Sequence, residues 1–280
     1  MKTIGFIDYY ISEWHANNYP LWIKEICEKE GKDFCIKYAW AEEYVSPVDG
    51  RNTDEWCKEF GVERCESIEE LCEKSDYILI LSPTNPEKHL AYAEIALKYK
   101  KNTYIDKTFA SNYETAKKIF DIAEENGTKF FSSSALRFAN ELEDFKGSKS
   151  IISFGSGSLF DEYIIHQIEM VQKIADEKPV AVKVEKQYEQ YFTTIEYKNG
   201  KMATMIFADA LPFQIYGRKD AEEGIYKTID SPFFINLLSD ILRFYESDEV
   251  SFDTKQTLAV MKIREAAIKG KDDLGNWQCL

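Results

Sequence analysis

The sequence predicts an α/β protein in which a doubly wound parallel sheet is followed by an α+β domain with an antiparallel sheet. Three observations favour this fold class. Up to residue 134, short apolar segments alternate with helical segments of about ten to fifteen residues. Beyond Gly147, three strand-like segments follow one another. The pair Asn199-Gly200, the strongest short signal for a hairpin, joins the last two of them.

Length and composition are those of a folded protein with two domains. The 280 residues are 44% hydrophobic and 30% charged, which excludes a disordered chain, a fibre and a coiled coil. We expect the first domain to span residues 1–134 and the second to span residues 135–280. The net charge of -14 argues against nucleic acid or an anionic membrane surface as a partner, because both reward clustered Lys and Arg.

In the first domain, each strand is a short apolar run and several helices carry their own start or stop signals. Gly31 ends one helix, Pro86 suits the first turn of another, and Ser111 with Glu114 forms a capping box. The expected strands are Lys2–Asp8, Phe34–Tyr38, Tyr77–Leu81, Thr103–Ile105 and Thr128–Ser132. The expected helices are Pro20–Glu30, Thr53–Phe60, Ser67–Lys74, Pro86–Lys100 and Ser111–Asn126.

The pattern of the second domain changes near Gly147. A strand at Ser150–Phe154 is followed by a helix at Glu162–Ala175. Two later helices begin near Ser231 and Asp253, which are favourable capping positions. The antiparallel sheet is expected to contain Val180–Gln187, Gln190–Lys198 and Lys201–Ala208.

Cysteine usage and hydropathy predict a cytoplasmic protein. None of the six cysteines lies in a Cys-x-x-Cys arrangement, and only three histidines are present to complete a metal site. We therefore expect reduced thiols and no metal. No apolar run approaches the roughly 20 residues that span a bilayer, and the segment from Met1 to Gly5 leads into a strand rather than a signal peptide.

Two motifs carry a family resemblance. The first joins Ser82-Pro83-Thr84-Asn85-Pro86-Glu87-Lys88-His89, after one strand, to Asp106-Lys107-Thr108, after the next. The second places Gly155-Ser156-Gly157 before a helix that carries Glu162 and His166. Over about residues 1–175, these motifs resemble those of the glucose–fructose oxidoreductase / inositol dehydrogenase (Gfo/Idh/MocA) family. That family has Glu-Lys-Pro at the Asp106 motif and Asp-x-x-x-His at the Glu162 motif, so the backbone geometry before Thr108 is left open.

The resemblance implies a Rossmann-like first domain and an oxidoreductase that transfers hydride between NAD or NADP and a carbinol of a sugar, cyclitol or related small polyol. It implies proton transfer by Lys107 and His166, and Glu162 one helical turn away could orient the imidazole. Lys107 and His166 would also bind substrate, together with Arg137 and Tyr163. The implied cofactor-binding residues are Asp8, Tyr10, Ser82, Thr84, Asn85, His89 and Asp106.

The residues themselves leave other interpretations open. Lys107 lies at the edge where open α/β sheets bind ligands, but it could be an ordinary lysine at a strand end. Glu162, His166 and Glu169 share a helix face that could equally be a solvated polar stripe. His89 could pack or cap a helix, and Arg137 could brace the boundary between domains or pair with a surface carboxylate.

The glycines of a dinucleotide fold are missing from the expected place. Gly-x-Gly-x-x-Gly normally follows the first strand and lets a pyrophosphate approach the backbone. In this chain Asp8, Tyr10 and Glu13 stand at the three positions. Like charges about 4 Å apart cost on the order of 1 to 4 kcal/mol at exposed to partly screened sites, so the ordinary pose of NAD or NADP is not expected.

Three functions therefore stay open: an oxidoreductase that holds its nicotinamide cofactor in an altered manner, a carbohydrate lyase or hydrolase that needs no cofactor, and a non-catalytic binding protein. The aromatic and polar loop Tyr9–Tyr19 favours a sugar ligand, although Tyr10 and Trp14 could equally plug a vacated groove. The expected partners are a small carbohydrate-like molecule and further copies of the chain, bound through the antiparallel sheet.

Overall fold

The computed structural model describes residues 1–219 and 223–280 and divides into two compact units. Unit 1 comprises Met1–Ser133 and Leu237–Thr254, whereas unit 2 comprises Ser134–Asn236 and Lys255–Leu280. The predicted division places all residues after 134 in the second domain. The structure differs from it at residues 237–254, which group with unit 1.

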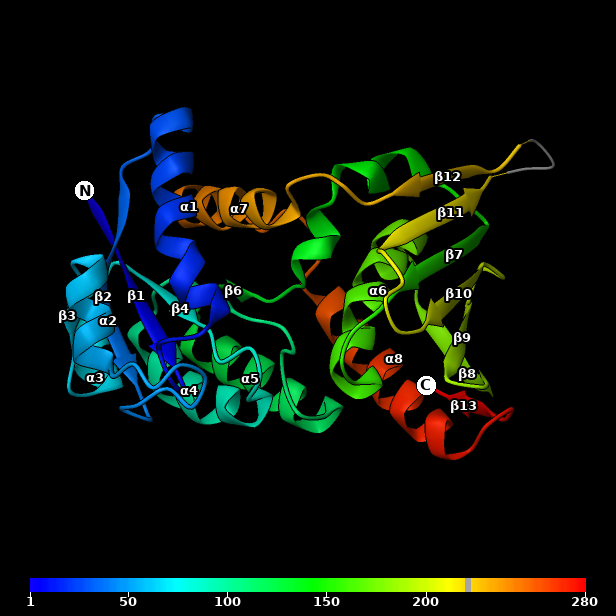
Figure 1. Cartoon of the computed structure of the whole chain (residues 1–280), viewed down its shortest axis with the longest axis horizontal. Coiled ribbons are helices and arrows are strands. Elements are labelled where there is room, and N and C mark those ends of the chain that lie inside the picture. The colour runs from blue at the N-terminus through cyan, green and yellow to red at the C-terminus, as the bar shows by residue number, and fades with distance from the viewer. Residues whose placement is uncertain (220–222) are drawn as a thin grey trace. The chain divides into compact units, whose positions relative to one another are not determined.

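Unit 1 is built on a parallel sheet (Figure 1). Its strands are β1 (Lys2–Asp8), β2 (Phe34–Ala41), β3 (Glu63–Arg64), β4 (Tyr77–Ile80), β5 (Thr103–Ile105) and β6 (Phe130–Phe131). The order β3-β2-β1-β4-β5-β6 is that of a doubly wound Rossmann-like fold, which confirms the predicted fold class. Strand β3 was not predicted, because two charged residues carry no apolar pattern.

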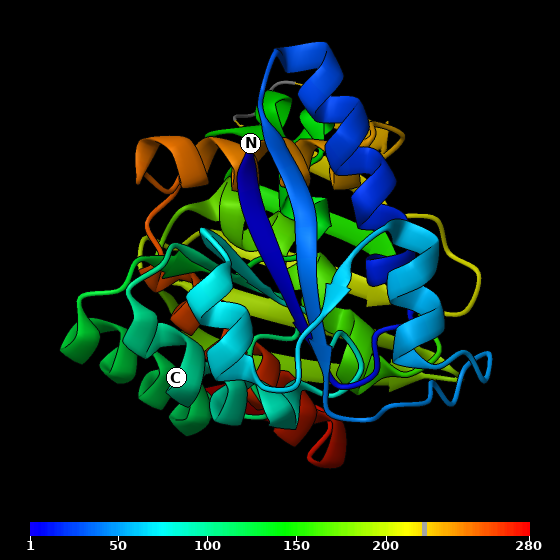
Figure 2. The same cartoon turned by 90° about the vertical axis from the view of Figure 1, so that its left-hand side faces the viewer.

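Helices cover both faces of this sheet. They are α1 (Trp14–Glu30), α2 (Thr53–Phe60), α3 (Ile68–Lys74), α4 (His89–Ala96), α5 (Tyr113–Asn126) and most of α7 (Phe233–Ser247), with the 3-10 turns η1 (Pro86–Lys88) and η2 (Leu97–Tyr99) on either side of α4. Figure 2 shows α1 and α2 on one side of β1 and β2, and α3 on the other. The cap of α5 is Asn112 rather than the predicted Ser111, since its side chain accepts from the Thr115 N–H at 2.8 Å.

Helix α1 begins at Trp14 and not at the predicted Pro20, so residues 14–19 of the predicted loop are helical. The cause is Glu13, whose extended backbone and side-chain hydrogen bonds to the first turn make it the N-cap. Pro20 lies inside the helix. The prediction was wrong because proline usually marks the first turn of a helix, and that signal outweighed the carboxylate before Trp14.

Aromatic packing returns the chain to unit 1 at residues 237–254. The Tyr245 hydroxyl donates to the Ile78 carbonyl oxygen at 2.7 Å, and its ring stacks on Tyr77 with centroids 4.6 Å apart. Phe244 packs edge-on against Phe131 with centroids 5.3 Å apart. Burial of these rings against β4 and β6 makes α7 part of the core of unit 1.

Unit 2 contains a second sheet and two long helices, α6 (Phe160–Ala175) and α8 (Lys255–Asp272). Its strands are β7 (Ser150–Gly155), β8 (Pro179–Gln187), β9 (Gln190–Tyr197), β10 (Met202–Phe207), β11 (Gln214–Arg218), β12 (Ile225–Thr228) and β13 (Trp277–Cys279). Their order is β12-β11-β7-β10-β9-β8-β13. Gly200 adopts a φ of 79° between the antiparallel strands β9 and β10, which confirms the hairpin at Asn199-Gly200.

The second sheet is mixed, whereas an antiparallel sheet was predicted. Strands β7 and β10 run parallel, and the other neighbouring pairs described are antiparallel. The chain leaves β7 through α6 and passes through β8 and β9 before it returns as β10, which leaves enough chain for a parallel crossover. No short sequence pattern predicts such a pairing, because the two strands are distant in sequence.

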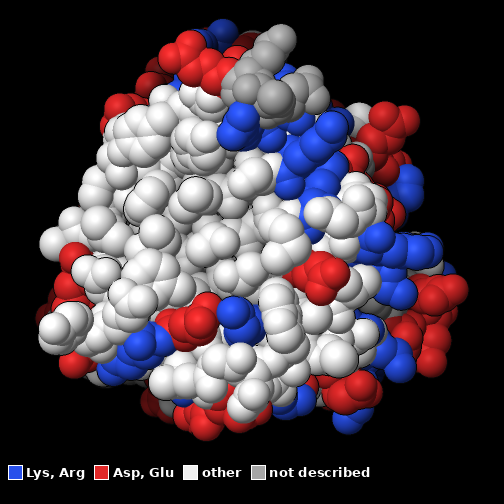
Figure 3. Space-filling model, turned by 90° about the vertical axis from the view of Figure 1, so that its right-hand side faces the viewer, with Lys and Arg blue, Asp and Glu red and all other residues white. Residues whose placement is uncertain are grey.

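The two faces of the second sheet have different surroundings. Ile151 and Ser153 of β7 are buried on the face that packs against α6, and Ile152 and Phe154 are half-exposed on the opposite face. On that opposite face, Met202 at the start of β10 is exposed. Figure 3 shows uncharged side chains over most of it, with charged residues toward its margin.

Within the described ranges, no helix is both long and apolar enough to cross a membrane, and no group of three His, Cys, Asp or Glu side chains is arranged to hold a metal ion. All six cysteines carry free thiols. Burial raises the pKa of Cys57 and Cys72 to about 12 and that of Cys65 to about 11, so these thiols are protonated and chemically inert at neutral pH.

Candidate functional site

Polar side chains gather where β1, β4 and β5 end, along what we call the carboxyl edge of unit 1. Asp8 is the last residue of β1, Ser82 follows β4 closely, and Asp106 directly follows β5. The first turn of α1 adds His15, and Glu13 precedes it. Ligands of open α/β sheets bind at this edge, so it is the first place to look for a site.

Asp106 and His15 form a buried pair at the carboxyl edge. His15 Nδ1 lies 2.8 Å from Asp106 Oδ2, and the Tyr104 hydroxyl donates to Asp106 Oδ1 at 3.1 Å. Burial by itself would raise the pKa of Asp106, but the charge and hydrogen bond of His15 outweigh it and lower that pKa. The Asp106 carboxyl is therefore ionised and held by two side chains.

Asp8 and Glu13 are two further carboxyls buried at this edge. Asp8 Oδ1 accepts from the N–H groups of Tyr9 at 2.7 Å and Ser82 at 3.0 Å, while Oδ2 has no hydrogen-bond partner among the described residues. Burial and the nearby charge of Glu13 raise the pKa of Asp8 well above its usual range. The proton on Asp8 is therefore held to higher pH in the folded chain than in the unfolded chain.

Replacing Asp8 with asparagine tests this protonation. Because the pKa of Asp8 is higher in the folded chain than in the unfolded chain, its contribution to stability is complete below about pH 4 and is lost as pH rises through the folded-state pKa. As pH rises toward the folded-state pKa and beyond it, we expect the free energy of unfolding of Asp8→Asn to increase relative to that of wild type. The increase should be up to about 1.4 kcal/mol per pH unit. Urea unfolding at pH 5, 7 and 8.5 measures the difference.

The matched control for that titration is Asp121→Asn, at an exposed position of α5. The free energy of unfolding of this variant is expected to change with pH as that of wild type does. Parallel pH curves for wild type and Asp8→Asn would show that Asp8 is ionised in the folded protein.

The carboxyl edge does not fit NAD or NADP in the ordinary pose. A dinucleotide pyrophosphate needs the N–H groups at the first helix's N-terminus, and here the Glu13 carboxylate accepts from those of His15 and Ala16. The hydroxyls of Tyr10 and Thr84 lie 3.1 Å apart and link the loops after β1 and β4. A pyrophosphate would therefore meet a carboxylate instead of free amides.

The loops after β4 and β5 approach each other at Lys107. This half-buried side chain donates from Nζ to the Pro83 carbonyl oxygen at 3.3 Å, and its peptide bond to Thr108 is cis. The exposed hydroxyl of Thr84 donates to Asn85 Oδ1 at 3.2 Å. The structure thus places Lys107, Thr84 and Asn85 together at the carboxyl edge.

His89 occupies a different environment from the one the resemblance implies. Its ring is fully buried, with Nδ1 3.0 Å from the Phe109 carbonyl oxygen and Nε2 2.6 Å from that of Leu81. Burial lowers the pKa of His89 in spite of these contacts. We therefore assign His89 to the framework that joins the ends of β4 and β5, rather than to contact with a cofactor.

Unit 2 holds a second polar cluster, in which α6 faces the 3-10 turn η3 (Ala135–Phe138). His166 Nδ1 lies 2.6 Å from the hydroxyl of Ser134, the residue that caps η3. One turn along α6, the buried Glu169 accepts from the Ser134 N–H at 3.3 Å and from Arg137 Nη1 at 3.0 Å. His166 is thus held by a serine whose backbone is fixed by a buried ion pair.

Arg137 is a framework residue in this arrangement. Only 3% of its surface is exposed, and besides Glu169 it contacts Gln256 of α8. Its own carbonyl oxygen accepts from Lys173 Nζ at 2.9 Å. The carboxylate that pairs with Arg137 is therefore buried and not on the surface, and the guanidinium is taken up in packing rather than presented to a substrate.

The glycine-rich turn before α6 seats two aromatic side chains beside His166. A Cβ on Gly157 would lie 2.1 Å from the Tyr163 ring, and a Cβ on Gly155 would lie 2.7 Å from that of Phe213. The ring centroids of Tyr163 and Phe213 lie 5.8 and 6.0 Å from that of His166. Glycine is needed here for close approach, and the side chains that flank His166 depend on it.

Sequence reasoning missed several members of these clusters. Glu162 is exposed on α6, and His166 Nδ1 contacts Ser134, which was not predicted as a site residue. His15 was not predicted as a site residue, because the sequence predicts a loop at residues 14–19. Glu13 was predicted as the replacement of a glycine and not as the cap of a helix. A carboxylate followed by a helical pattern could have signalled the cap, but nothing local signals the pairing of His15 with Asp106.

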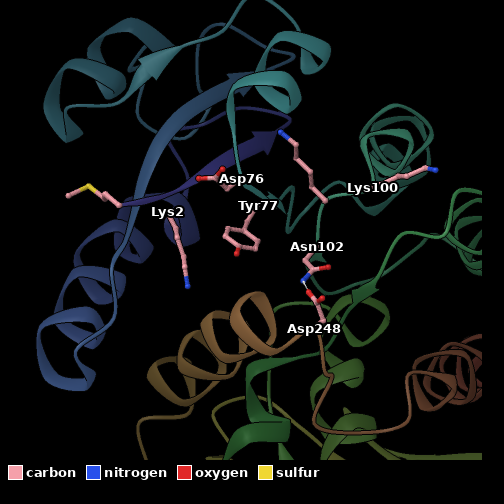
Figure 4. A pocket seen from close by; sticks show the side chains of 8 residues that line it. Lys2, Asp76, Tyr77, Lys100, Asn102 and Asp248 are labelled. Carbon is pink, nitrogen blue, oxygen red and sulfur yellow. Dashed lines mark hydrogen bonds between the residues drawn. The ribbon is translucent and has the colours of Figure 1, made fainter.

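A pocket of about 430 Å³ lies at the opposite edge of the unit 1 sheet. Lys2 at the start of β1, Tyr77 at the start of β4 and Asn102 before β5 line it, with Asp248, which accepts from Asn102 at 2.6 Å (Figure 4). Lys2 is already paired with Glu246 at 3.0 Å. Because this pocket lies at the amino ends of the strands, we do not assign it to the candidate site.

Residues 43–134 match the family described as an oxidoreductase family with an NAD-binding Rossmann fold, Gfo/Idh/MocA. A probable dehydrogenase from Thermotoga maritima is 13% identical with a TM-score of 0.82, over 99% of this chain and 98% of that one. Apo scyllo-inositol dehydrogenase from Lactobacillus casei is 15% identical with a TM-score of 0.75, over 99% and 98%. GenD2 from gentamicin A biosynthesis, in complex with NAD, is 10% identical with a TM-score of 0.76, over 100% and 97%.

The chain therefore has the fold seen in these proteins. Residues 43–134 match the Gfo/Idh/MocA oxidoreductase family, which confirms the resemblance that the motifs indicate. Identities this low show the fold alone, and no curated protein matches the sequence. The matched segment includes Lys107 but begins after Asp8 and Glu13, the part of the carboxyl edge that does not fit a dinucleotide.

Proposed function

We propose that the protein is an oxidoreductase that acts on a carbinol carbon of a sugar, cyclitol or related small polyol. The observation that carries this proposal is the place of Lys107, at the carboxyl end of β5 and inside the segment that matches the oxidoreductase family. The names of the neighbours, which include a scyllo-inositol dehydrogenase, support a polyol as the substrate class.

Two side chains are proposed to handle protons. Lys107 Nζ would hydrogen-bond the substrate hydroxyl and exchange a proton with its oxygen, as a partly desolvated lysine can. His166 would act as the second acid or base, and Ser134 would fix the orientation of its ring. Tyr163 would shape the surroundings of His166, since Gly157 lets its ring approach.

NAD or NADP, when bound, would supply the hydride acceptor or donor of such a reaction. The ordinary pose of the cofactor does not fit the first turn of α1, so no step is assigned through it. A second candidate function follows from the same observation. Acid–base chemistry of the lyase or hydrolase type on a carbohydrate needs no nicotinamide, and the filled α1 N-terminus favours it.

Fluorescence titration with NADH and NADPH separates these functions. The oxidoreductase proposal expects saturable binding of one of them, and no binding at millimolar cofactor would end it. Thermal shifts with a panel of sugars and cyclitols then test the second candidate, which expects a stabilisation that His166→Ala abolishes. A protein stabilised by neither cofactor nor sugar would instead fit a non-catalytic role.

We also propose that the second sheet binds another copy of the chain. Support comes from its opposite face, where half-exposed Phe154 of β7 pairs with half-exposed Ile206 of β10 and packs near Tyr226 of β12, with ring centroids 6.5 Å apart. Figure 3 shows how few charges interrupt this face, although the chain carries 49 acidic residues. Contiguous apolar surface of this kind favours an interface.

Introducing charge on this face should produce monomers. The double variant Phe154→Lys/Ile206→Lys is expected to reduce the mass measured by light scattering to the 32.5 kDa of one chain. Tyr188→Lys is the control, because Tyr188 lies in the turn between β8 and β9 and is 97% exposed. A wild-type protein that is already monomeric would contradict the proposal.

A further inference from the structure

We infer that Glu13 is a built-in substitute for the diphosphate of a dinucleotide, because its carboxylate holds the amide groups of α1 that a diphosphate would need. The inference is independent of the substrate and reaction proposed above. It concerns only what the carboxyl edge of unit 1 can bind.

Both carboxyl oxygens of Glu13 accept hydrogen bonds from the first turn of α1. Glu13 Oε2 accepts from the His15 N–H at 2.8 Å, and Oε1 accepts from the Ala16 N–H. The Glu13 carbonyl oxygen accepts from the Asn17 N–H at 2.9 Å and starts the helical ladder. With Glu13 only 6% exposed, the amide groups of the helix end are satisfied by a buried carboxyl group of the protein itself.

The residues around Glu13 hold the cap in place from a second loop. Ser12 Oγ donates to Asp49 at 2.6 Å and accepts from Arg51, while Ser46 donates to the Ser12 carbonyl oxygen at 2.7 Å. Asn17 Oδ1 accepts from Arg51 Nη2 at 2.6 Å. Glu13 is therefore tied at both of its flanks to residues 46–51.

The first turn of α1 is also anchored to the core. Asn17 Oδ1 accepts from the indole N–H of the buried Trp56 at 2.9 Å, and His15 pairs with Asp106. Each polar residue of the run Ser12, Glu13, His15 and Asn17 thus has a structural partner. A run that looks like a sugar-binding loop in the sequence serves to fix the N-terminus of a helix.

The charges at this edge reinforce the exclusion of a diphosphate. Asp106 is an ionised carboxylate, and Glu13 lies beside the amides at which the phosphates would bind. A diphosphate would have to displace Glu13, break the ties of Ser12 and Asn17, and enter next to two carboxyl groups. The structure therefore assigns this edge to ligands that place no diphosphate on α1.

Amide NMR of the full chain tests the inference, with ADP as the diphosphate probe and NADH as the cofactor. In wild type, the amide resonances of His15 and Ala16 are expected to stay unchanged up to millimolar ADP or NADH. Glu13→Ala should shift both resonances and lower the thermal midpoint by about 2–4 °C through loss of the cap. Asn52→Ala, which removes the cap of α2, should lower the midpoint similarly without moving them.

The outcomes separate this inference from the proposed oxidoreductase. Saturable shifts of the His15 and Ala16 amides with ADP or NADH in wild type would overturn the role of Glu13 and leave the oxidoreductase proposal intact. NADH binding that leaves both amides unchanged supports both. Absence of NADH binding ends the oxidoreductase proposal and supports the role of Glu13.

Discussion

Replacing Arg137 with methionine is expected to lower the free energy of unfolding by about 3–5 kcal/mol, because it leaves the Glu169 carboxylate buried without its partner. The two side chains are 4% exposed each and 3.0 Å apart. The loss should extend to His166, since Glu169 also holds the backbone N–H of Ser134. Urea unfolding of wild type and variant measures the difference.

Two further variants make that result specific. Lys24→Met breaks a pair with Glu28 on the exposed surface of α1 and should cost well under about 1 kcal/mol. The double variant Arg137→Met/Glu169→Leu removes both charges and should recover most of the lost stability. If Arg137→Met were no more costly than Lys24→Met, the buried pair would not have the structural role described above.

Replacing His166 with alanine is expected to lower turnover by about 10²–10⁴-fold, the usual contribution of a general acid or base. The assay uses the sugar or cyclitol that gives the largest thermal shift with wild type. Ser134→Ala should produce a smaller loss and change the pH profile of the rate, because it removes the hydroxyl that lies 2.6 Å from His166 Nδ1. Ser134→Thr keeps a hydroxyl and should restore much of the wild-type profile.

Lys107→Ala provides the complementary measurement in unit 1. Affinity for the same ligand should change little, while turnover is lost, if Lys107 transfers the proton rather than binding the ligand. A fully active Lys107→Ala or His166→Ala protein would refute the role assigned to that residue.

Much of the fold was accessible from the sequence because its signals are local. Apolar runs at β1 and β4, the glycine at Gly31 and the Asn199-Gly200 turn each act within a few residues. The parallel pairing of β7 with β10 and the return of α7 to unit 1 depend on contacts between distant segments. No periodicity in the chain could have predicted them.

For the candidate site, the sequence predicted where residues lie on strands and helices, but not which of them are buried. The motifs placed Lys107 at a strand end and His166 on a helix, because strand ends and helix faces follow from spacing. Burial determined the other positions: His89, Arg137 and Asp8 are enclosed in the protein, and Glu13 caps α1. Polarity alone does not distinguish a side chain that meets a ligand from one that satisfies the protein's own backbone.

The division of the chain has a consequence for how the protein can be made and cut. Unit 1 is complete only when residues 237–254 have been synthesised, and unit 2 only when residues 255–280 have followed. A fragment ending at Ser133 would leave Ile78 and Phe131 without Tyr245 and Phe244. Neither unit is therefore a continuous segment that could be excised or exchanged by a single cut in the gene.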